Sequence, residues 1–280
     1  MQKISRMKEM FRSSGLHTVC ESAHCPNLGK CWGQGVATFM ILGEVCTRAC
    51  RFCAVKAGRA APVDPQEPQH VAEAVKKLNL RYVVITSVAR DDLQDEGAGQ
   101  FVETMAAVRR LMPQTKIEIL VPDFSNKIEN LKMVIDAKPE VASHNIETVR
   151  RLSPDIRPQA DYGRSLEVLK NFKRLNPSIL TKSSFMAGLG ESADEIAGVM
   201  EDLKQTGCDI LTIGQYLSPS RGKRHVRVER FFTPEEFASL RETGLKMGFK
   251  HVESGPLVRS SFIAEEGYKN CITKMETASS

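Results

Sequence analysis

Short apolar runs alternate with amphipathic stretches along most of the chain. Each run is apolar on both faces, as is typical of a parallel strand buried on both sides. Most consecutive runs are separated by residues with helical spacing, and this alternation predicts a parallel sheet with right-handed crossovers. Six such units favour a barrel, or a large part of one. The six predicted strands span residues 37–43, 81–88, 115–122, 140–147, 178–189 and 209–217.

Two of the intervening helices have recognisable ends. The sequences SADE, from Ser192 to Glu195, and TPEE, from Thr233 to Glu236, fit the capping box. The second has a proline at the first helical position, where the missing N–H costs nothing. Gly207 follows the helix that begins at Ser192, as a C-terminal stop should.

Both ends of the chain lack the alternating pattern. The first 35 residues show no strand pattern, and the last 20 or so resemble a frayed tail. The proline-rich stretch 58–68 is interpreted as a surface loop. We therefore expect an N-terminal extension over residues 1–35, one barrel core over 36–258 and a C-terminal segment over 259–280.

Composition and charge narrow the class of protein. With 280 residues, 41% of them hydrophobic and 26% charged, the chain has the make-up of a soluble globular protein. No apolar run is long enough to span a membrane, and the N-terminus lacks an apolar signal core, so we expect a cytoplasmic protein without a membrane partner. The net charge is +5, with the densest basic patch at Ser220–Arg230. Such a patch fits an acidic protein or anionic small molecule as well as nucleic acid.

Six of the eight cysteines lie between residues 20 and 53, and this clustering favours metal binding over a disulfide framework. The sequence CTRACRFC places Cys46, Cys50 and Cys53 directly after the first strand, at the mouth where parallel folds hold their chemistry. Three thiolates can bind three irons of a [4Fe–4S] cluster and leave the fourth iron open to a small molecule. The alternative is a zinc site completed by a remote histidine, His24 or His144, although zinc modules usually supply a second pair of cysteines.

The remaining cysteines have separate interpretations. Cys20, Cys25 and Cys31 form an upstream trio that also lacks a fourth ligand. Cys208 lies between a glycine and an apolar strand, which predicts a buried structural thiol. Cys271 lies in the C-terminal tail, and we expect it to be exposed and dispensable. Trp32, next to the upstream trio, is expected either to shield a cluster from solvent or simply to pack in the core.

The CxxxCxxC spacing resembles that of the radical S-adenosylmethionine (SAM) enzymes. In that family the amino and carboxylate groups of SAM chelate the open iron, and an electron from the cluster releases a 5′-deoxyadenosyl radical. The upstream spacing CxxxxCxxxxxC is similar to the auxiliary-cluster motif of lipoyl synthases. The similarity extends over almost the whole chain, through the strings FMILGEVCTRACRFCAV, YVVITSVARDDL, HNIETV, GLGE, LTIGQYL, TPEEF and SGPLVRSS.

The resemblance implies two [4Fe–4S] clusters and their ligands. The first cluster would be held by Cys46, Cys50 and Cys53. The auxiliary cluster would be held by Cys20, Cys25, Cys31 and a serine of the RSSF string, Ser261, with Ser260 as the alternative. Phe262 replaces the tyrosine of the family pattern, which removes a hydroxyl but leaves the serine. A weak oxygen ligand suits a cluster that must give up its sulfide.

The resemblance also implies where SAM would bind. Asn145 and Glu147, at the end of the fourth strand, could hold the ribose hydroxyls, because an amide and a carboxylate match a diol. Gly188 and Gly190 would allow the adenine or methionyl group to approach the backbone, or they could form an ordinary strand-to-helix turn. Thr86 and Ser87, at the end of the second strand, complete the predicted SAM contacts.

The implied reaction inserts two sulfur atoms, at C6 and C8, into an octanoyl chain on a lysine of a carrier domain. It would consume two SAM molecules per lipoyl group, and the auxiliary cluster would supply the sulfur. The carrier would belong to a 2-oxoacid dehydrogenase or be the glycine-cleavage H protein. An electron donor such as flavodoxin or ferredoxin and a cluster-assembly carrier protein are also implied, and nucleic acid is not expected. Arg224 and Arg227 could help to dock the carrier, or their segment could be a solvated loop.

Two other functions remain open at this point. A biotin synthase-like enzyme would share CTRACRFC, but it would have no need for the upstream trio together with RSSF. A zinc-stabilised module that binds nucleic acid would need four ligands per metal and aromatic residues among the basic ones. Only 6% of the residues are aromatic.

Overall fold

The computed structural model describes residues 8–9, 11, 15–23, 25–33 and 36–278. The chain divides into two compact units. The first unit comprises Met1–Ala49 and Ala54–Ala142, and the second comprises Cys50–Cys53 and Ser143–Ser280. The short strand β7, Val141–Ser143, is the point at which the chain passes from the first unit into the second.

The first unit is built on adjacent strands in the order β1-β2-β5-β6. Strands β2, β5 and β6 are parallel, whereas β1 pairs with β2 in the antiparallel sense. Strands β3 and β4 form a separate parallel pair. The bounds of these strands are β1 His17–Thr18, β2 Ala37–Ile41, β3 Val45–Cys46, β4 Lys56–Ala57, β5 Tyr82–Ser87 and β6 Lys116–Leu120.

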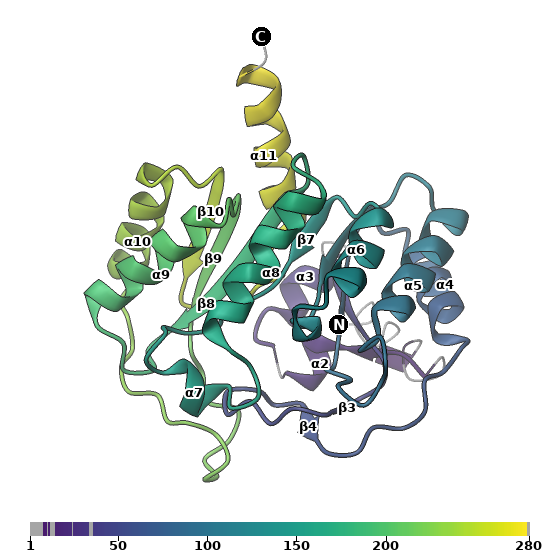
Figure 1. Ribbon diagram of the computed structural model, residues 1–280, viewed down its shortest axis with the longest axis horizontal. Coiled ribbons are helices and arrows are strands. Elements are labelled where there is room, and N and C mark those ends of the chain that lie inside the picture. Colours follow the sequence, from purple (N-terminus) through teal and green to yellow (C-terminus); the bar gives the residue numbers. More distant parts are fainter. Residues whose placement is uncertain (1–7, 10, 12–14, 24, 34–35, 279–280) are drawn as a thin grey trace. The chain divides into compact units, whose positions relative to one another are not determined.

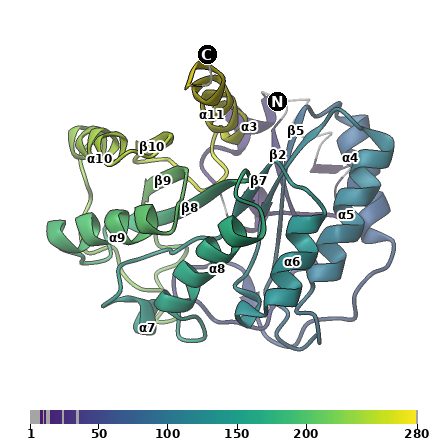
Figure 2. The same cartoon turned by 45° about the horizontal axis from the view of Figure 1, so that its top comes forward.

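Three long helices cover the strands of this unit, and α4, α5 and α6 lie side by side in Figures 1 and 2. In α5 the buried residues Phe101, Met105 and Val108 recur at helical spacing, so that one apolar stripe packs on the sheet. The helices of the unit are α2 Val19–Ser22, α3 Leu28–Gly33, α4 Glu67–Lys77, α5 Ala98–Leu111, the 3₁₀ turn η1 Phe124–Asn126 and α6 Ile128–Asp136.

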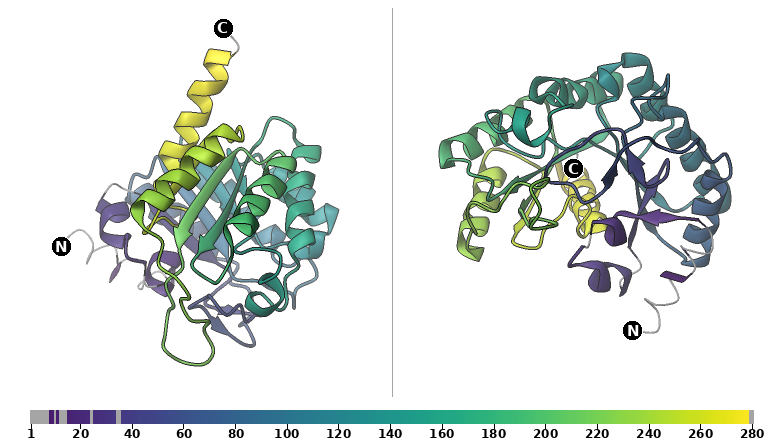
Figure 3. Two further views of the ribbon diagram at one scale, coloured as in Figure 1. Left: turned by 90° about the vertical axis from the view of Figure 1, so that its left-hand side faces the viewer. Right: turned by 90° about the horizontal axis from the view of Figure 1, so that it is seen from below.

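The second unit contains three adjacent parallel strands in the order β8-β9-β10. Helices α8, α9 and α10 run beside these strands in Figure 1, and α11 follows β10 at the C-terminal end of the chain. The bounds are α7 Ser153–Ile156, α8 Tyr162–Leu175, β8 Leu180–Ala187, α9 Ala193–Gln205, β9 Ile210–Gln215, α10 Pro234–Lys246, β10 His251–Gly255 and α11 Ala264–Ala278. The loop between β9 and α10 extends beyond the strands in the left view of Figure 3.

The predicted strands and helix ends are confirmed. All six strands lie within the predicted ranges. Both capping boxes form: Ser192 Oγ accepts from the Glu195 N–H at 3.2 Å, and Thr233 Oγ1 accepts from the Glu236 N–H at 3.2 Å. Gly207 follows α9 with a φ of +83°, which is a left-handed conformation that favours glycine. Residues 58–66 form no helix or strand, as expected for the loop.

Three expectations about the ends of the chain are wrong. The N-terminal segment, in which no strand was expected, contains the short strand β1. Within the core, β10 was also missed, because its sequence, HVESG, is polar and ends in glycine. The expected frayed tail is the helix α11. Cys271, expected to be exposed, is fully buried within that helix. Its neighbours Ala264 and Gly267 are buried on the same face, at helical spacing that the sequence already contained.

The predicted burial of Cys208 is confirmed, and Trp32 is buried too. Cys208 is buried, with 1% of its surface exposed. Trp32 is fully buried and packs edge-on against Phe11, with 5.3 Å between the ring centroids. No helix among the described residues is long and apolar enough to cross a bilayer.

Candidate active site

The cysteines of CTRACRFC are divided between the two units. Cys46 ends β3 in the first unit, whereas Cys50 and Cys53 belong to the second. All three side chains are partly exposed. In the described part of the chain no three His, Cys, Asp or Glu side chains are gathered as a metal site. Iron ligation by either trio therefore stays a prediction.

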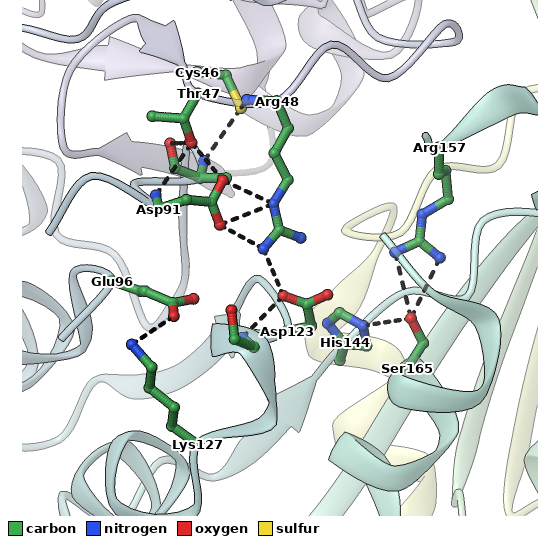
Figure 4. Close-up of polar contacts among 12 residues, drawn as sticks. Cys46, Thr47, Arg48, Asp91, Glu96, Asp123, Lys127, His144, Arg157 and Ser165 are labelled. Atoms are coloured by element: carbon green, nitrogen blue, oxygen red, sulfur yellow. Dashed lines mark hydrogen bonds and ion pairs between the residues drawn. The ribbon is translucent and has the colours of Figure 1, made fainter. Parts of the chain in front are cut away.

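The surroundings of Cys46 suit a thiolate that ligates iron. Its Sγ accepts hydrogen bonds from the backbone N–H of Arg48 at 3.4 Å and of Ala89 at 3.3 Å. Thr47 ties the same two segments together, since its N–H donates to the Ala89 carbonyl at 3.1 Å and its Oγ1 donates to Asp91 Oδ2 at 2.6 Å. Figure 4 shows the bonds around this sulfur. Donors aimed at sulfur stabilise its negative charge and are one means by which proteins tune iron–sulfur clusters.

Arg48 is buried beside this sulfur and pairs with two carboxylates (Figure 4). Its guanidinium bonds to both oxygens of Asp91, with Nη2 to Oδ1 at 2.6 Å, and Nη2 also lies 2.7 Å from Oδ1 of Asp123. Burial alone would raise the pKa of Asp91, but Arg48 and the hydroxyl of Thr47 lower it below its usual value. Burial would likewise lower the pKa of Arg48, whereas its two carboxylate partners raise it. Arg48 and Asp91 therefore stay charged at neutral pH.

The second half of the cysteine loop is held within the other unit. Arg51 forms an ion pair with Asp155 of α7, and its N–H donates to the Ile156 carbonyl at 2.8 Å. The Val226 N–H donates to the Arg51 carbonyl at 3.0 Å. A ring nitrogen of His225, Nε2, lies 3.0 Å from the Cys53 carbonyl. The basic loop between β9 and α10 is thus bonded to the segment that carries Cys50 and Cys53.

Two residues predicted to bind SAM end β5, and they differ in what their hydroxyls do. Thr86 Oγ1 donates to the Leu120 carbonyl at 2.8 Å, so its proton is already used inside the sheet. Ser87 Oγ is buried and has no hydrogen-bond partner among the described residues. A buried hydroxyl without a partner is costly and suggests a missing ligand or water. Ser87 is therefore the better candidate of the two.

Asn145 and Glu147 lie together after β7. Asn145 Nδ2 donates to Glu147 Oε1 at 2.9 Å, and Asn145 Oδ1 is buried with no partner among the described residues. Glu147 has a φ of +67°, which is unusual for a residue with a side chain. Burial raises the pKa of Glu147, while Arg157 and Asn145 act in the opposite direction. The open amide oxygen and the carboxylate could both accept from ribose hydroxyls.

A buried hydrogen-bond network holds the segment that carries Asn145 and Glu147. Arg157 Nη1 donates to the Ile146 carbonyl at 2.8 Å, and both its Nη atoms lie 3.4 Å from Ser165 Oγ. His144 Nε2 lies 3.0 Å from the same hydroxyl, as drawn in Figure 4. His144, the alternative zinc ligand, is therefore bonded within this network.

The glycines of GLGE both adopt left-handed conformations, with φ of +106° at Gly188 and +99° at Gly190. A Cβ on Gly188 would lie 2.2 Å from Nε2 of Gln215 and 2.4 Å from the Arg230 carbonyl oxygen. Packing inside the chain thus requires a glycine at position 188, and the ordinary turn explains it without a ligand. Glu191 closes the turn by accepting from the N–H groups of Gly188 and Leu189. Contact of these glycines with SAM stays a prediction.

The upstream trio lies in the first unit. Cys20 and Cys31 are buried, whereas Cys25 is partly exposed. Burial raises the pKa of the Cys20 thiol to about 11, and the nearby sulfurs of Cys25 and Cys31 add to the rise. Ser261, its predicted fourth partner, lies in the second unit, in the turn before α11. His24 lies outside the described residues.

Sequence reasoning missed the charged residues that support these segments. Arg48 and Asp91 stand inside the strings CTRACRFC and TSVARDD, whereas Asp123 and Arg157 stand outside every motif. The ion pair of Arg48 with Asp123 joins residues 75 positions apart. A charged residue in a single sequence carries no signal that identifies a partner at such a distance.

Comparisons with known proteins identify the relatives of this chain. The profile of the Radical SAM superfamily matches residues 40–203. The lipoyl synthase of Rubrobacter xylanophilus is 57% identical over 260 residues, which cover 93% of this chain and 80% of that protein. The lipoyl synthase of Geobacillus kaustophilus is 55% identical, with 93% and 87% covered.

Solved structures support the same fold. Methylornithine synthase (PylB) matches with a TM-score of 0.59 and 13% identity, over 85% of this chain and 68% of that one. HydG, a maturase of the [FeFe]-hydrogenase, matches with a TM-score of 0.61 and 11% identity, over 89% and 64%. The predicted α/β barrel class of the radical SAM type is thus confirmed. The extent and identity of the sequence matches decide the family: this chain belongs to the lipoyl synthases of the radical SAM superfamily, and it is an enzyme of the sulfurtransferase type.

Proposed function

We propose that this chain converts an octanoyl group, in amide linkage to a lysine of a carrier domain, into a lipoyl group by adding sulfur at C6 and C8. The observation that supports the proposal is that the Cys46 sulfur accepts hydrogen bonds from two backbone N–H groups. A thiolate so placed suits iron ligation and has no role as an acid or base. Both cysteine trios are then needed, one for the radical and one for the sulfur.

In this proposal Cys46, Cys50 and Cys53 hold the cluster that binds SAM. When bound, this cluster supplies the electron that splits SAM into the hydrogen-abstracting 5′-deoxyadenosyl radical, and the auxiliary cluster supplies the sulfide. The Ser87 hydroxyl, the Asn145 amide oxygen and the Glu147 carboxylate provide polar contacts for the nucleoside. Two of these have no protein partner among the described residues, as a ligand site requires.

The second cluster would be held by Cys20, Cys25, Cys31 and the hydroxyl oxygen of Ser261. Oxygen is a weaker ligand than thiolate for a thiophilic iron, so this bond would release first when the cluster is taken apart. The N-terminal extension, residues 1–35, and the C-terminal segment from residue 259 then serve this cluster, while residues 36–258 form the core.

The partners follow from the reaction. We propose an octanoylated lipoyl domain of a 2-oxoacid dehydrogenase, or a glycine-cleavage H protein, as substrate. An electron donor such as flavodoxin or ferredoxin and a cluster-assembly carrier protein complete the set. A cytoplasmic location stays a prediction.

Mass spectrometry of a model substrate tests the proposal. Anaerobically reconstituted enzyme, reductant and SAM are incubated with an octanoyl-lysyl peptide, and we expect a gain of two sulfurs with loss of hydrogens. Cys46→Ala should abolish SAM cleavage, whereas Cys31→Ala should retain it without sulfur insertion. Cys208→Ala, outside both trios, is the matched control and should retain both activities. SAM cleavage by the unaltered enzyme without sulfur gain would refute the proposal.

Iron content provides a second test, independent of turnover. Two [4Fe–4S] clusters require about eight irons per chain. Replacing either trio by alanine should remove about half of the iron and leave the remaining cluster visible by electron paramagnetic resonance (EPR). Full iron content after loss of a trio would contradict the assigned ligands.

A further inference from the structure

Arg48 joins three loops of the first unit that follow different strands. Its backbone lies beside Cys46, while its side chain reaches Asp91 in the loop after β5 and Asp123 after β6. We propose that Arg48, with its two carboxylate partners, is a positioning residue for the SAM-binding cluster and acts through the sulfur of Cys46. This inference rests on the proposed function, because it assumes that Cys46 ligates iron.

The burial of Arg48 and Asp123 requires an explanation, whereas Asp91, the third member of this ion triad, is partly exposed. Arg48 has 8% of its side chain exposed and Asp123 has 0%, so the charges of both are largely removed from water. Buried ion pairs rarely improve stability over apolar packing, because desolvation offsets the attraction. What the forked guanidinium does supply is geometry, since it binds both oxygens of Asp91 and one of Asp123 at fixed angles.

The turn that presents Asp123 is strained. Phe124, Ser125 and Asn126 have φ values of +44°, +49° and +56°, three successive non-glycine residues in the left-handed region. Each such residue is costly and persists only where its surroundings impose it. Asp123 Oδ1 accepts from the Ser125 N–H at 3.2 Å as well as from Arg48. The strained turn and the guanidinium therefore share one carboxylate oxygen.

The ion triad orients the two N–H groups that reach sulfur. Anchoring the Arg48 guanidinium restrains the backbone of Arg48, whose N–H lies 3.4 Å from Cys46 Sγ. Asp91, held by Arg48, also accepts from Thr47 Oγ1 at 2.6 Å, and the Thr47 N–H in turn donates to the Ala89 carbonyl at 3.1 Å. The Ala89 N–H is the second donor to the sulfur. Since hydrogen bonds to sulfur favour the reduced cluster, their loss should lower its reduction potential.

Two measurements on the full chain test the inference. The first is amide hydrogen exchange of Arg48 and Ala89 in the cluster-free protein, which reports whether these N–H groups are held. The second is the midpoint potential of the SAM-binding cluster in the reconstituted enzyme. That cluster is identified by the part of the EPR signal that changes when SAM is added.

The variants are chosen to avoid an unpaired buried charge. Arg48→Gln combined with Asp123→Asn removes the triad without leaving Asp123 charged and buried alone. Thr47→Val keeps every charge and removes the hydroxyl that donates to Asp91. Asp136→Asn is the control, because its carboxylate is exposed and pairs with the exposed Lys132 on α6, so its loss leaves no buried charge unpaired.

We expect the amides of Arg48 and Ala89 to exchange on the order of tenfold faster in both test variants. The loss of a charge-assisted hydrogen bond changes an equilibrium constant by about one power of ten or more. We also expect a lower midpoint potential, with the control at wild-type values in both measurements. Unchanged potentials would overturn the inference even if exchange rises, because the triad would then serve the fold alone. A wild-type enzyme without any SAM-sensitive cluster would instead refute the proposed function.

Discussion

Asp209 is a buried carboxylate next to β9 that accepts bonds from three residues. Its Oδ2 lies 2.6 Å from Lys173 Nζ and 2.9 Å from the Thr181 N–H, and its Oδ1 lies 2.9 Å from Lys250 Nζ. Burial alone would raise its pKa, but these donors lower the pKa below the ordinary value of 3.8. One residue thus connects α8, β8 and the segment that enters β10.

Replacing Asp209 by Asn should destabilise the protein by roughly 3 kcal/mol at pH 7, because two lysines lose a buried partner. A carboxyl with a lowered folded-state pKa stabilises the fold above its unfolded-state pKa. This contribution is lost as pH falls through the folded-state value. In urea unfolding, the difference in free energy of unfolding between wild type and Asp209→Asn should therefore be largest at pH 7 and should decrease below pH 4. Asp136→Asn, which removes an exposed ion pair with Lys132, should change little. A difference in free energy of unfolding that does not change with pH would contradict this role of Asp209.

The two cysteines outside the trios should be chemically inert. Burial raises the pKa of Cys208 to about 12 and that of Cys271 to about 11, and the nearby Asp209 adds to both. Because only the thiolate reacts, an alkylating reagent at pH 8 should spare both residues in the native cluster-free protein. The partly exposed Cys25, Cys46, Cys50 and Cys53 should be labelled. Peptide mass spectrometry before and after unfolding in urea checks this, and early labelling of Cys271 would show that α11 is not docked.

Among the elements, α11 changes the interpretation of the C-terminus most. Its buried face contacts β10: a Cβ on Gly267 would lie 3.2 Å from the His251 ring, and Lys274 Nζ donates to the Lys250 carbonyl at 2.7 Å. Ser261 lies in the turn directly before this helix. A docked helix therefore restrains the segment that carries the proposed oxygen ligand.

Cys271→Asp should undock α11, since an unpaired carboxylate in its buried face would cost about 3 kcal/mol or more. Thermal unfolding should show a lowered midpoint, and iron bound by the upstream trio should fall if α11 restrains Ser261. Thr273→Asp, on the exposed face of the same helix, is the control and should leave both unchanged. Equal midpoints for the two variants would mean that the helix does not contribute to stability through this face.

For the molecule as a whole, the distribution of positive charge indicates where an acidic carrier domain could bind. The net charge is +5, and the basic stretch Ser220–Arg230 lies in the loop between β9 and α10, next to Phe231, of which 69% is exposed. His225, within this stretch, is bonded to the Cys53 carbonyl. An acidic carrier bound there would lie close to the segment that carries Cys53, and its association would weaken with salt.

Reversing Arg224 and Arg227 together to Glu should raise KM for an octanoylated carrier by roughly tenfold at low salt and reduce its salt dependence. The KM for a short octanoyl-lysyl peptide should not change, because the peptide lacks the carrier surface. Lys76→Glu with Lys77→Glu, on the exposed face of α4, is the matched control. Equal KM values for the carrier with wild type and the loop variant would show that the loop is merely solvated.

Much of the architecture could be predicted from local sequence. The six strands, both capping boxes and the stop at Gly207 follow from patterns within a few residues, and each is found where it was predicted. The spacings of the two cysteine trios, together with the strings along the rest of the chain, likewise resemble those of the family. These features could be predicted because hydrophobic periodicity, caps and ligand spacing are encoded by neighbours in the chain.

What only the tertiary structure decided are the contacts between distant segments. The pairing of Arg48 with Asp91 and Asp123, the three donors to Asp209 and the burial of Cys271 all join residues that local patterns treat as independent. The same is true of Gly188, whose missing side chain is explained by Gln215 and Arg230. A charge or a glycine in the sequence indicates only what it could do. Its partner is decided by the fold, because the strength of a buried interaction depends on distance, geometry and exclusion of water, which exist only after the chain has packed.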